Sequence, residues 1–165
     1  MTDFKPMRRS RQQLSTEECE TILNRCTSGT LALAGHGGYP YAVPLSYVYA
    51  NGSIFFHSAL QGHKIDAIRQ DNHCSFCVID QDQVKPAEFT TYFRSVIVFG
   101  RIQIIENDDE KLQALRLLGR RYSPNHEQGL QHEIDKSLSH VLVLRLDIDH
   151  MTGKEAIELT KARNC

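Results

Sequence analysis

The sequence lacks the features of several large classes of protein. Its 19 Lys and Arg are balanced by 20 Asp and Glu, so there is no excess of positive charge to bind nucleic acid or an anionic membrane surface. No apolar run approaches the length that crosses a bilayer. The five cysteines are odd in number and scattered, which does not suit a disulfide framework. We therefore expect a cytoplasmic protein with reduced thiols, no nucleic-acid partner and no membrane partner.

A chain of 165 residues can bury a hydrophobic core without disulfide or metal support. With no repeat or low-complexity segment, we expect a single domain over residues 1–165. Its parts would be an N-terminal arm (1–12), a body of strands and helices (13–157) and a C-terminal tail (158–165). Three arginines fall within residues 8–11 of the arm, and a disordered arm is favoured over a strap that becomes ordered against an anion.

Capping signals and apolar spacing predict three helices. Ser15 begins a capping box, and Gly29 stands where a left-handed helix end would fall. The apolar face between them consists of Cys19, Ile22, Leu23 and Cys26. A short helix is expected after Gly62, and Asn107 caps a third helix that has leucines at helical spacing.

Elsewhere apolar residues alternate with polar ones, which is typical of β-strands. We expect six strands, at 30–34, 41–49, 53–57, 73–79, 92–105 and 140–148. Asn51-Gly52 predicts a tight hairpin, and hairpins rather than long helices join most strands. The predicted fold is therefore mainly β, a six-stranded antiparallel barrel with flanking α-helices. The strand at 92–105 is apolar on both faces, which a homodimer interface would cover.

One segment has the chemistry of an anion site. The strand that ends at His57 leads through Gly62 into a helix whose first turn carries His63 and Lys64. Free backbone amides, the positive end of the helix dipole and the Lys64 ammonium would converge on a phosphate. Taken alone, this segment is explained more simply by a solvated lysine at a helix start.

Two other segments favour a bound cofactor. Pro44 interrupts a strand, so it marks an edge, a bulge or a place where a ligand meets the backbone. Tyr92, Arg94 and Ser95 open the long strand with an aromatic ring, a cation and a hydroxyl. A flat aromatic cofactor would fit on the backbone exposed near Pro44.

These motifs, in their order, resemble a known family. The segments that carry the resemblance are 39–47, 56–59 with 62–64, 92–100 and 152–156. Together they resemble the flavin-binding split-barrel superfamily that includes pyridoxamine 5'-phosphate oxidase, and within it the nitroimidazole-resistance (Nim) branch. The similarity extends from residue 7 to residue 156.

The resemblance implies a homodimer of six-stranded split barrels with FMN bound at two sites along the interface, each site partly formed by the partner chain. The implied FMN-binding residues are Val43, Pro44, Leu45, Ser46, His57, Ser58, His63, Lys64, Tyr92, Arg94 and Ser95. Among these, Ser58, His63 and Lys64 would hold the phosphate. His57 would be the catalytic residue, a proton donor beside the flavin ring, although a buried and hydrogen-bonded His57 is an alternative. No metal site is implied.

The function implied is that of an FMN-dependent oxidoreductase that reduces a small electrophilic acceptor such as a nitroimidazole, with a reductant that the residues do not identify. Residues 158–165 lack the Arg-containing substrate segment of true pyridoxamine phosphate oxidases, and no Trp exists to stack on the cofactor. An FMN- or haem-binding protein without turnover is an alternative, with His57 or His63 as the haem ligand. A cofactor-free interaction module is a third.

The other candidates are weaker. Cys74 and Cys77 match a CxxC pattern, but in a strand a spacing of three directs the two thiols to opposite faces. The four remaining histidines considered, His126, His132, His140 and His150, show no metal-ligand spacing. Residues 152–154 follow the last predicted strand as a turn.

Overall fold

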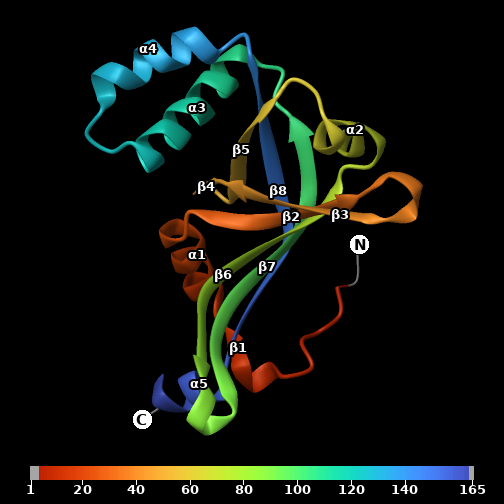
Figure 1. Cartoon of the computed structure of the whole chain (residues 1–165), viewed down its shortest axis with the longest axis vertical. Helices are drawn as coiled ribbons and strands as arrows, with labels where there is room; N and C mark the ends of the chain where they lie inside the picture. Colours follow the sequence, from red (N-terminus) through yellow and green to blue (C-terminus); the bar gives the residue numbers. More distant parts are fainter. Residues whose placement is uncertain (1–3, 164–165) are drawn as a thin grey trace.

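The computed structural model describes residues 4–163 (Figure 1). Residues 1–3 of the predicted arm and residues 164–165 of the predicted tail lie outside the described residues. The elements in chain order are η1 (Ser10–Gln12), β1 (Gln13–Leu14), α1 (Thr16–Arg25), β2 (Ser28–Ala34), η2 (His36–Gly38), β3 (Pro40–Ser46), β4 (Val48–Ala50), β5 (Ser53–Ala59), α2 (His63–Gln70), β6 (His73–Lys85), η3 (Pro86–Glu88), β7 (Thr90–Ile104), α3 (Asp108–Tyr122), α4 (Glu127–Ser137), β8 (Val141–Glu155) and α5 (Ile157–Arg163).

The strands form one antiparallel sheet in the order β3-β2-β6-β7-β8-β5-β4, with β1 paired to β8. The predicted class, mainly β and antiparallel with flanking helices, is confirmed. Six strands have seven residues or more and match the six predicted ones. The predicted strand at 41–49 is broken at Tyr47 into β3 and β4, which lie at opposite ends of the strand order. The sheet therefore curls until its two ends meet at one residue.

Tyr47 is fully buried at this junction. Its hydroxyl donates a hydrogen bond to the carbonyl of Leu23 in α1 at 2.8 Å. Its backbone N–H donates to the hydroxyl of Tyr122 in α3 at 2.7 Å. Side chains from β2, β5, β6, β7 and β8 pack around it in the main core, where its ring meets Phe76 edge-on at 5.1 Å between centroids. One residue thus joins both ends of the sheet to two helices.

The predicted start of α1 is confirmed, whereas its predicted end is wrong. The Ser15 hydroxyl accepts from the Glu18 N–H at 3.2 Å, which completes the capping box. The helix ends at Arg25, and Gly29 lies inside β2. A Cβ on Gly29 would lie 2.5 Å from the Phe76 ring and 2.7 Å from the Cys77 carbonyl oxygen. This glycine therefore permits close packing of β2 on β6 and has no part in ending the helix.

The predicted turn at 152–154 is also wrong, because β8 continues through it to Glu155. Thr152 pairs with Ile97 and Gly153 with Val96 of β7. A side chain at Gly153 would collide with the Cys19 sulfur and with Leu14. The glycine lets α1 and β1 approach β8, so the strand crosses the molecule without a break.

Helices α3 and α4 form a hairpin at one end of the molecule (Figure 1). Asn107 caps α3 as predicted, since its side-chain oxygen accepts from the Glu110 N–H at 2.9 Å. A second, smaller core beneath the hairpin consists of Ile105, Ala114, Leu115, Ile134 and Val143. Neither α4 nor α5 was predicted, and α5 occupies most of the predicted tail. No helix within residues 4–163 is long and apolar enough to cross a membrane.

The Asn51-Gly52 hairpin is confirmed between β4 and β5, where Ala50 pairs with Ser53. Both turn residues have positive φ, 52° for Asn51 and 77° for Gly52. This is the geometry of a two-residue turn that matches the twist of the strands. The turn fixes the register of β5, and with it the positions of His57 and Ser58 at the far end of that strand.

Substitution of Gly29 by Ala is expected to lower the free energy of unfolding by about 1–3 kcal/mol, because the added methyl group overpacks the contact with Phe76. Gly129→Ala is the matched control: its Cβ meets no atom within 4 Å, and alanine favours the α4 helix by about 0.5–1 kcal/mol. Urea denaturation of the three proteins measures both changes. A Gly29→Ala protein as stable as the wild type would contradict the packing argument.

Candidate functional site

The start of α2 gathers free backbone donors and a cation. Gly62 precedes the helix with a φ of 132°, a left-handed conformation that favours glycine, and no side chain caps the helix. Lys64 is partly buried and forms no ion pair with the residues of the 4–163 range. Burial lowers the pKa of its ammonium below the ordinary lysine value. The turn therefore holds a partly dehydrated positive charge beside unsatisfied N–H groups.

The strand before α2 separates two predicted site residues. Ser58 points into the barrel and is 7% exposed, whereas His57 faces the opposite side and is exposed. The alternative of a buried, hydrogen-bonded His57 is therefore wrong. His63, the first residue of α2, is exposed and meets Tyr41 edge-on with ring centroids 5.3 Å apart. Of the predicted phosphate ligands, His63 and Lys64 share the helix start, and Ser58 presents its side chain to the interior.

The four predicted residues of β3 also alternate between the two sides. Val43 and Leu45 pack against the main core, whereas Pro44 and Ser46 are exposed on the outer side. β3 lies at one end of the strand order, so the prediction that Pro44 marks an edge is confirmed. An approaching ligand would therefore meet Pro44 and Ser46, with Val43 and Leu45 supporting the strand from behind.

Tyr92, Arg94 and Ser95 do not share one pocket within this chain. Arg94 points inward and pairs with Glu155 at 3.1 Å and with Asp80 at 3.4 Å. Ser95 faces the outer side beside Lys154, its partner in β8. Tyr92 lies in the hairpin between β6 and β7, where its hydroxyl donates to Glu88 at 2.7 Å. Arg94 therefore already neutralises two carboxylates of its own chain, and one of them, Glu155, is 1% exposed.

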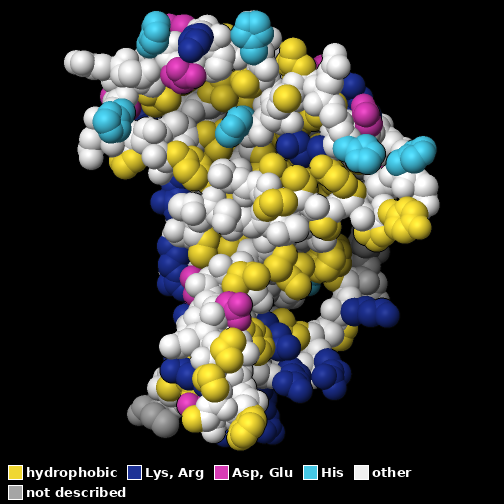
Figure 2. Space-filling model, viewed as in Figure 1, with side chains coloured by type: hydrophobic (Ala, Val, Ile, Leu, Met, Phe, Trp, Pro, Cys, Tyr) yellow, Lys and Arg dark blue, Asp and Glu magenta, His cyan; other side chains and the backbone are white. Residues whose placement is uncertain are grey.

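The outer face of β7 and β8 forms a cavity of 520 Å³ with the N-terminal arm. Its lining consists of Phe4, Lys5, Met7, Ser95, Ile97, Phe99, His150, Thr152 and Lys154. Phe4 stacks on His150 with ring centroids 4.5 Å apart. Figure 2 shows basic side chains gathered near the arm and hydrophobic ones at the level of β2 and β3. The arginines of the arm are exposed, but the prediction of a disordered arm is wrong for residues 4–12, because Phe4 packs on His150 and Gln12 is buried, contacts that had no signal in the sequence.

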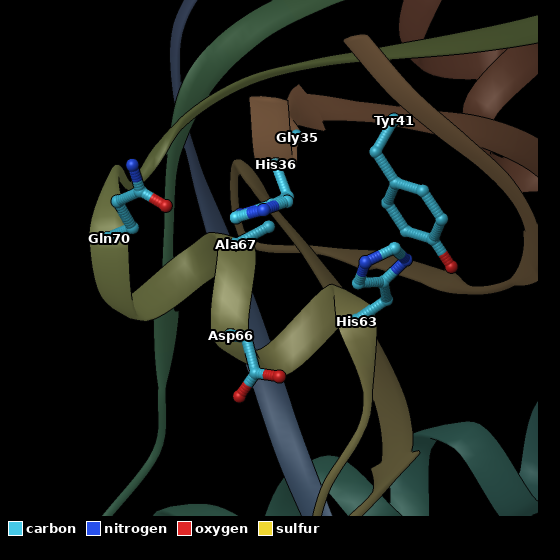
Figure 3. A pocket seen from close by; sticks show the side chains of 7 residues that line it. All are labelled: Gly35, His36, Tyr41, His63, Asp66, Ala67 and Gln70. Carbon is cyan, nitrogen blue, oxygen red and sulfur yellow. The ribbon is translucent and has the colours of Figure 1, made fainter. Parts of the chain in front are cut away.

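A smaller cavity of 210 Å³ opens between α2, β3 and the β2–β3 turn (Figure 3). Its polar and aromatic lining includes His36, Tyr41, His63, Asp66 and Gln70. Sequence analysis missed it, because the turn and the helix meet only through folding. The spacing of Asp66 and Gln70 by four residues was the one local sign that they share a helix face.

The two thiols of the CxxC pattern are separated as predicted. Cys74 is buried on the core side of β6, and Cys77 is half-buried on the outer side. Burial raises the pKa of the Cys74 thiol to about 12 and also raises that of Cys77. Both therefore stay protonated and poorly nucleophilic at neutral pH.

An antiparallel sheet that curls until its ends meet, with helices on its outside, is a split β-barrel. The family model described as pyridoxamine 5'-phosphate oxidase matches residues 15–155. The chain therefore belongs to this family, as its motifs predicted. A search of curated proteins found no significant match.

Solved structures of similar fold include three with different descriptions. A candidate 5-nitroimidazole antibiotic resistance protein from Bacteroides thetaiotaomicron is 22% identical, with a TM-score of 0.71 over 87% of this chain and 86% of that one. An FAD-binding protein from Mesorhizobium loti is 27% identical, with a TM-score of 0.59 over 87% and 96%. An FAD- and haem-binding protein from Mycobacterium smegmatis is 23% identical, with a TM-score of 0.77 over 93% and 80%.

Proposed function

We propose that this protein binds the FMN part of a flavin and reduces a small electrophilic acceptor. The observation that carries the proposal is Lys64, a partly buried cation without an ion-pair partner in the described range, at the uncapped start of α2. A phosphate there would accept bonds from free helix N–H groups and offset the dehydration of the ammonium. The descriptions of the similar proteins from Mesorhizobium loti and Mycobacterium smegmatis support a flavin as the ligand.

The flavin ring would lie along the exposed side of β3, against Pro44 and Ser46. Val43 and Leu45 would hold that strand in place through the core. Part of the pocket would come from a second copy of the chain, with Ser95 as a polar contributor from its outer face. The Tyr92 hydroxyl is hydrogen-bonded within its own hairpin, and Arg94 is paired with a carboxylate of its own chain. Either residue would therefore contact flavin only in the site of the partner subunit.

The homodimer itself is proposed from the outer face of the sheet. A row of outward residues crosses five strands through the pairs Pro44–Thr30–Cys77–Ile97–Thr152. These side chains are small, hydroxylated or apolar, and none is charged. Ile97 is 40% exposed and Phe99 39%. This uncharged and partly apolar row, with Lys154 beside Ser95 at its margin, is the part of the sheet that a second subunit would cover.

His57 is the proposed proton donor. When bound and reduced, a flavin supplies the electron pair to an acceptor such as a nitro compound. Two-electron reduction of a nitro group also takes up two protons, and the exposed side chain of His57 would donate one of them to a nitro oxygen. His57 and the start of α2 at His63 are six residues apart in sequence, which is compatible with one ligand spanning both.

A haem- or flavin-binding protein without turnover is the second candidate. The observation that favours it is the pair of exposed imidazoles, His57 and His63, either of which could ligate haem iron. The description of the Mycobacterium smegmatis protein as binding both cofactors supports it. The absorption spectrum of the purified protein separates the two cofactors: a bound flavin gives two broad bands, and haem gives a sharp Soret band. If flavin is bound, anaerobic turnover of a nitro compound separates an enzyme from a binding protein.

Lys64→Ala is expected to weaken FMN binding by about 10- to 100-fold, because one charge-assisted bond to phosphate contributes about 1.5–3 kcal/mol. Riboflavin, which has no phosphate, should bind the variant and the wild type equally. FMN affinity of the wild type should also fall as pH rises through the lowered pKa of Lys64, where the ammonium loses its charge. Lys136→Ala on α4 is the control. Equal losses for FMN and riboflavin would place the phosphate elsewhere.

Ile97→Arg is expected to convert the dimer to a monomer, since it places a charge within the uncharged row of the proposed interface. Analytical ultracentrifugation measures the change. Val84→Arg is the control, because its side chain is already 65% exposed in the hairpin between β6 and β7, away from the row. A wild-type protein that sediments as a monomer at micromolar concentration would rule out the proposed interface.

His57→Gln is expected to keep bound flavin while lowering the rate of nitro reduction by about a hundredfold. Turnover is followed anaerobically with a chemical reductant, after flavin content has been matched between proteins. His132→Gln, at an exposed position of α4, is the control. Unchanged turnover in the His57 variant would remove its catalytic role and leave flavin binding intact.

A further inference from the structure

The cavity between the N-terminal arm and the outer face of β7 and β8 has a floor that changes in character along its length. The floor consists of three directly opposed pairs, Ser95 with Lys154, Ile97 with Thr152, and Phe99 with His150. Directly opposed residues of two strands lie on one face of the sheet. At about 3.3 Å per residue, the floor runs for about 13 Å from a polar end at Lys154 to an aromatic end at His150. A volume of 520 Å³ is typical of pockets that enclose small organic ligands.

The arm forms an aromatic wall over one end of this floor. The Phe4 ring stacks on His150 with centroids 4.5 Å apart, and it lies 5.6 Å from the Phe99 ring at a tilt of 35°. Met7, further along the arm, also lines the cavity. Aromatic groups arranged in this way offer faces and edges to a further ring. A flat aromatic ligand would therefore be held between the arm and the sheet.

The other end of the floor presents a positive charge. Lys154 is half-buried, and its ammonium lies over the Phe93 ring, 5.2 Å from the centroid. Lys5 of the arm adds a second cation, and no carboxylate of residues 4–163 lines the cavity. No ion pair within the same range includes either lysine. An anionic group beside Lys154 would therefore meet a cation that the chain does not neutralise, next to the hydroxyl of Ser95.

The charges around the cavity also favour an anion. The two carboxylates that adjoin its lining in sequence are already paired, Glu155 with Arg94 at 3.1 Å and Asp149 with Arg101 at 3.7 Å. Residues 4–11 of the arm include four cations and no acidic residue, and Figure 2 shows basic side chains gathered near the arm. A surface of one sign beside a cavity raises the local concentration of ligands of the opposite sign.

We propose that this cavity binds a small aromatic carboxylate, with its ring over Ile97 towards the aromatic end and its carboxylate at Lys154 and Ser95. The role of this ligand as the electron acceptor rests on the proposed function, because Ser95 is also the residue proposed to contribute to the flavin site of a second copy. The acceptors would then be aromatic acids rather than neutral nitro compounds. Ile97 and Thr152 belong both to this floor and to the uncharged row, so a second subunit would close the cavity from outside.

The matched probes are 4-nitrobenzoate and 4-nitrobenzamide, which differ in charge but hardly in shape. In calorimetric titrations of the purified full-length protein without reductant, the acid is expected to bind about tenfold or more tightly than the amide. Lys154→Gln should weaken binding of the acid by about tenfold and leave the amide within about twofold. Phe4→Ala should weaken both probes to the same degree, because it removes a ring and no charge. Lys136→Gln, at an exposed position of α4, is the matched control.

Equal affinity for the acid and the amide would overturn the site, and so would a preference for the acid that Lys154→Gln leaves intact. Displacement of the acid by added FMN would show that the cavity is part of the flavin site, and would also overturn it. The thermal midpoints of the variants verify that each is folded.

Failure of the proposed function gives a different result. Reduction of the nitro group to a nitroso group takes two electrons from reduced flavin and two protons, and it releases water. It is followed anaerobically as reoxidation of photoreduced flavin on the protein, and the acid is expected to react at lower concentration than the amide. A protein that binds the acid as expected, but binds no flavin or is not reoxidised by the acid, would overturn the proposed function and leave the carboxylate site in place.

Discussion

The architecture depends on closing the sheet at Tyr47. β3 and β4 are the two edge strands of the sheet and are not paired with each other, so the buried Tyr47 between them is what holds the two edges together. Burial raises the pKa of the Tyr47 hydroxyl, so it remains a neutral hydrogen-bond donor to the carbonyl of Leu23 over the whole physiological pH range. Closure is also what brings α2 against β2 and β3, and both the phosphate site and the cavity beside it arise from that approach.

Charge pairs stabilise the opposite end of the molecule. Glu155 at the end of β8 lies between Arg94 and Arg163, and the Gln12 side chain donates to its carbonyl at 2.9 Å. Asp80 also pairs with Arg94. Burial favours the neutral form of the Asp80 carboxyl, but the hydrogen bonds that it accepts from Arg25 hold its pKa below the ordinary value. Removing one partner from such a cluster leaves a buried charge uncompensated, so these groups act together.

Local signals predicted most of the fold and part of the site. The Ser15 cap, the Asn51-Gly52 turn and the alternating strands all depend on neighbours in the chain, and the structure has them where they were expected. Gly29 and Gly153 were misinterpreted because each is required by a contact across the fold, with Phe76 and Cys19 respectively. The cavity beside α2 and the ion pairs around Glu155 likewise join segments far apart in sequence. The motifs identified the family. Their spacing alone could not show which side chains of one motif point into the barrel and which point outward.

The alternation along β7 has a consequence for how this protein can change. Arg94, Val96 and Val98 face inward and belong to the charge cluster or the core, whereas Ser95, Ile97 and Phe99 face outward. The even-numbered residues of this stretch thus support folding, whereas the odd-numbered residues between them form the outer surface. Libraries that vary only the odd-numbered positions would explore new ligands and partners on an unaltered scaffold. Inserting or deleting one residue would exchange the two sets, so lineages should tolerate many substitutions here and almost no change in length.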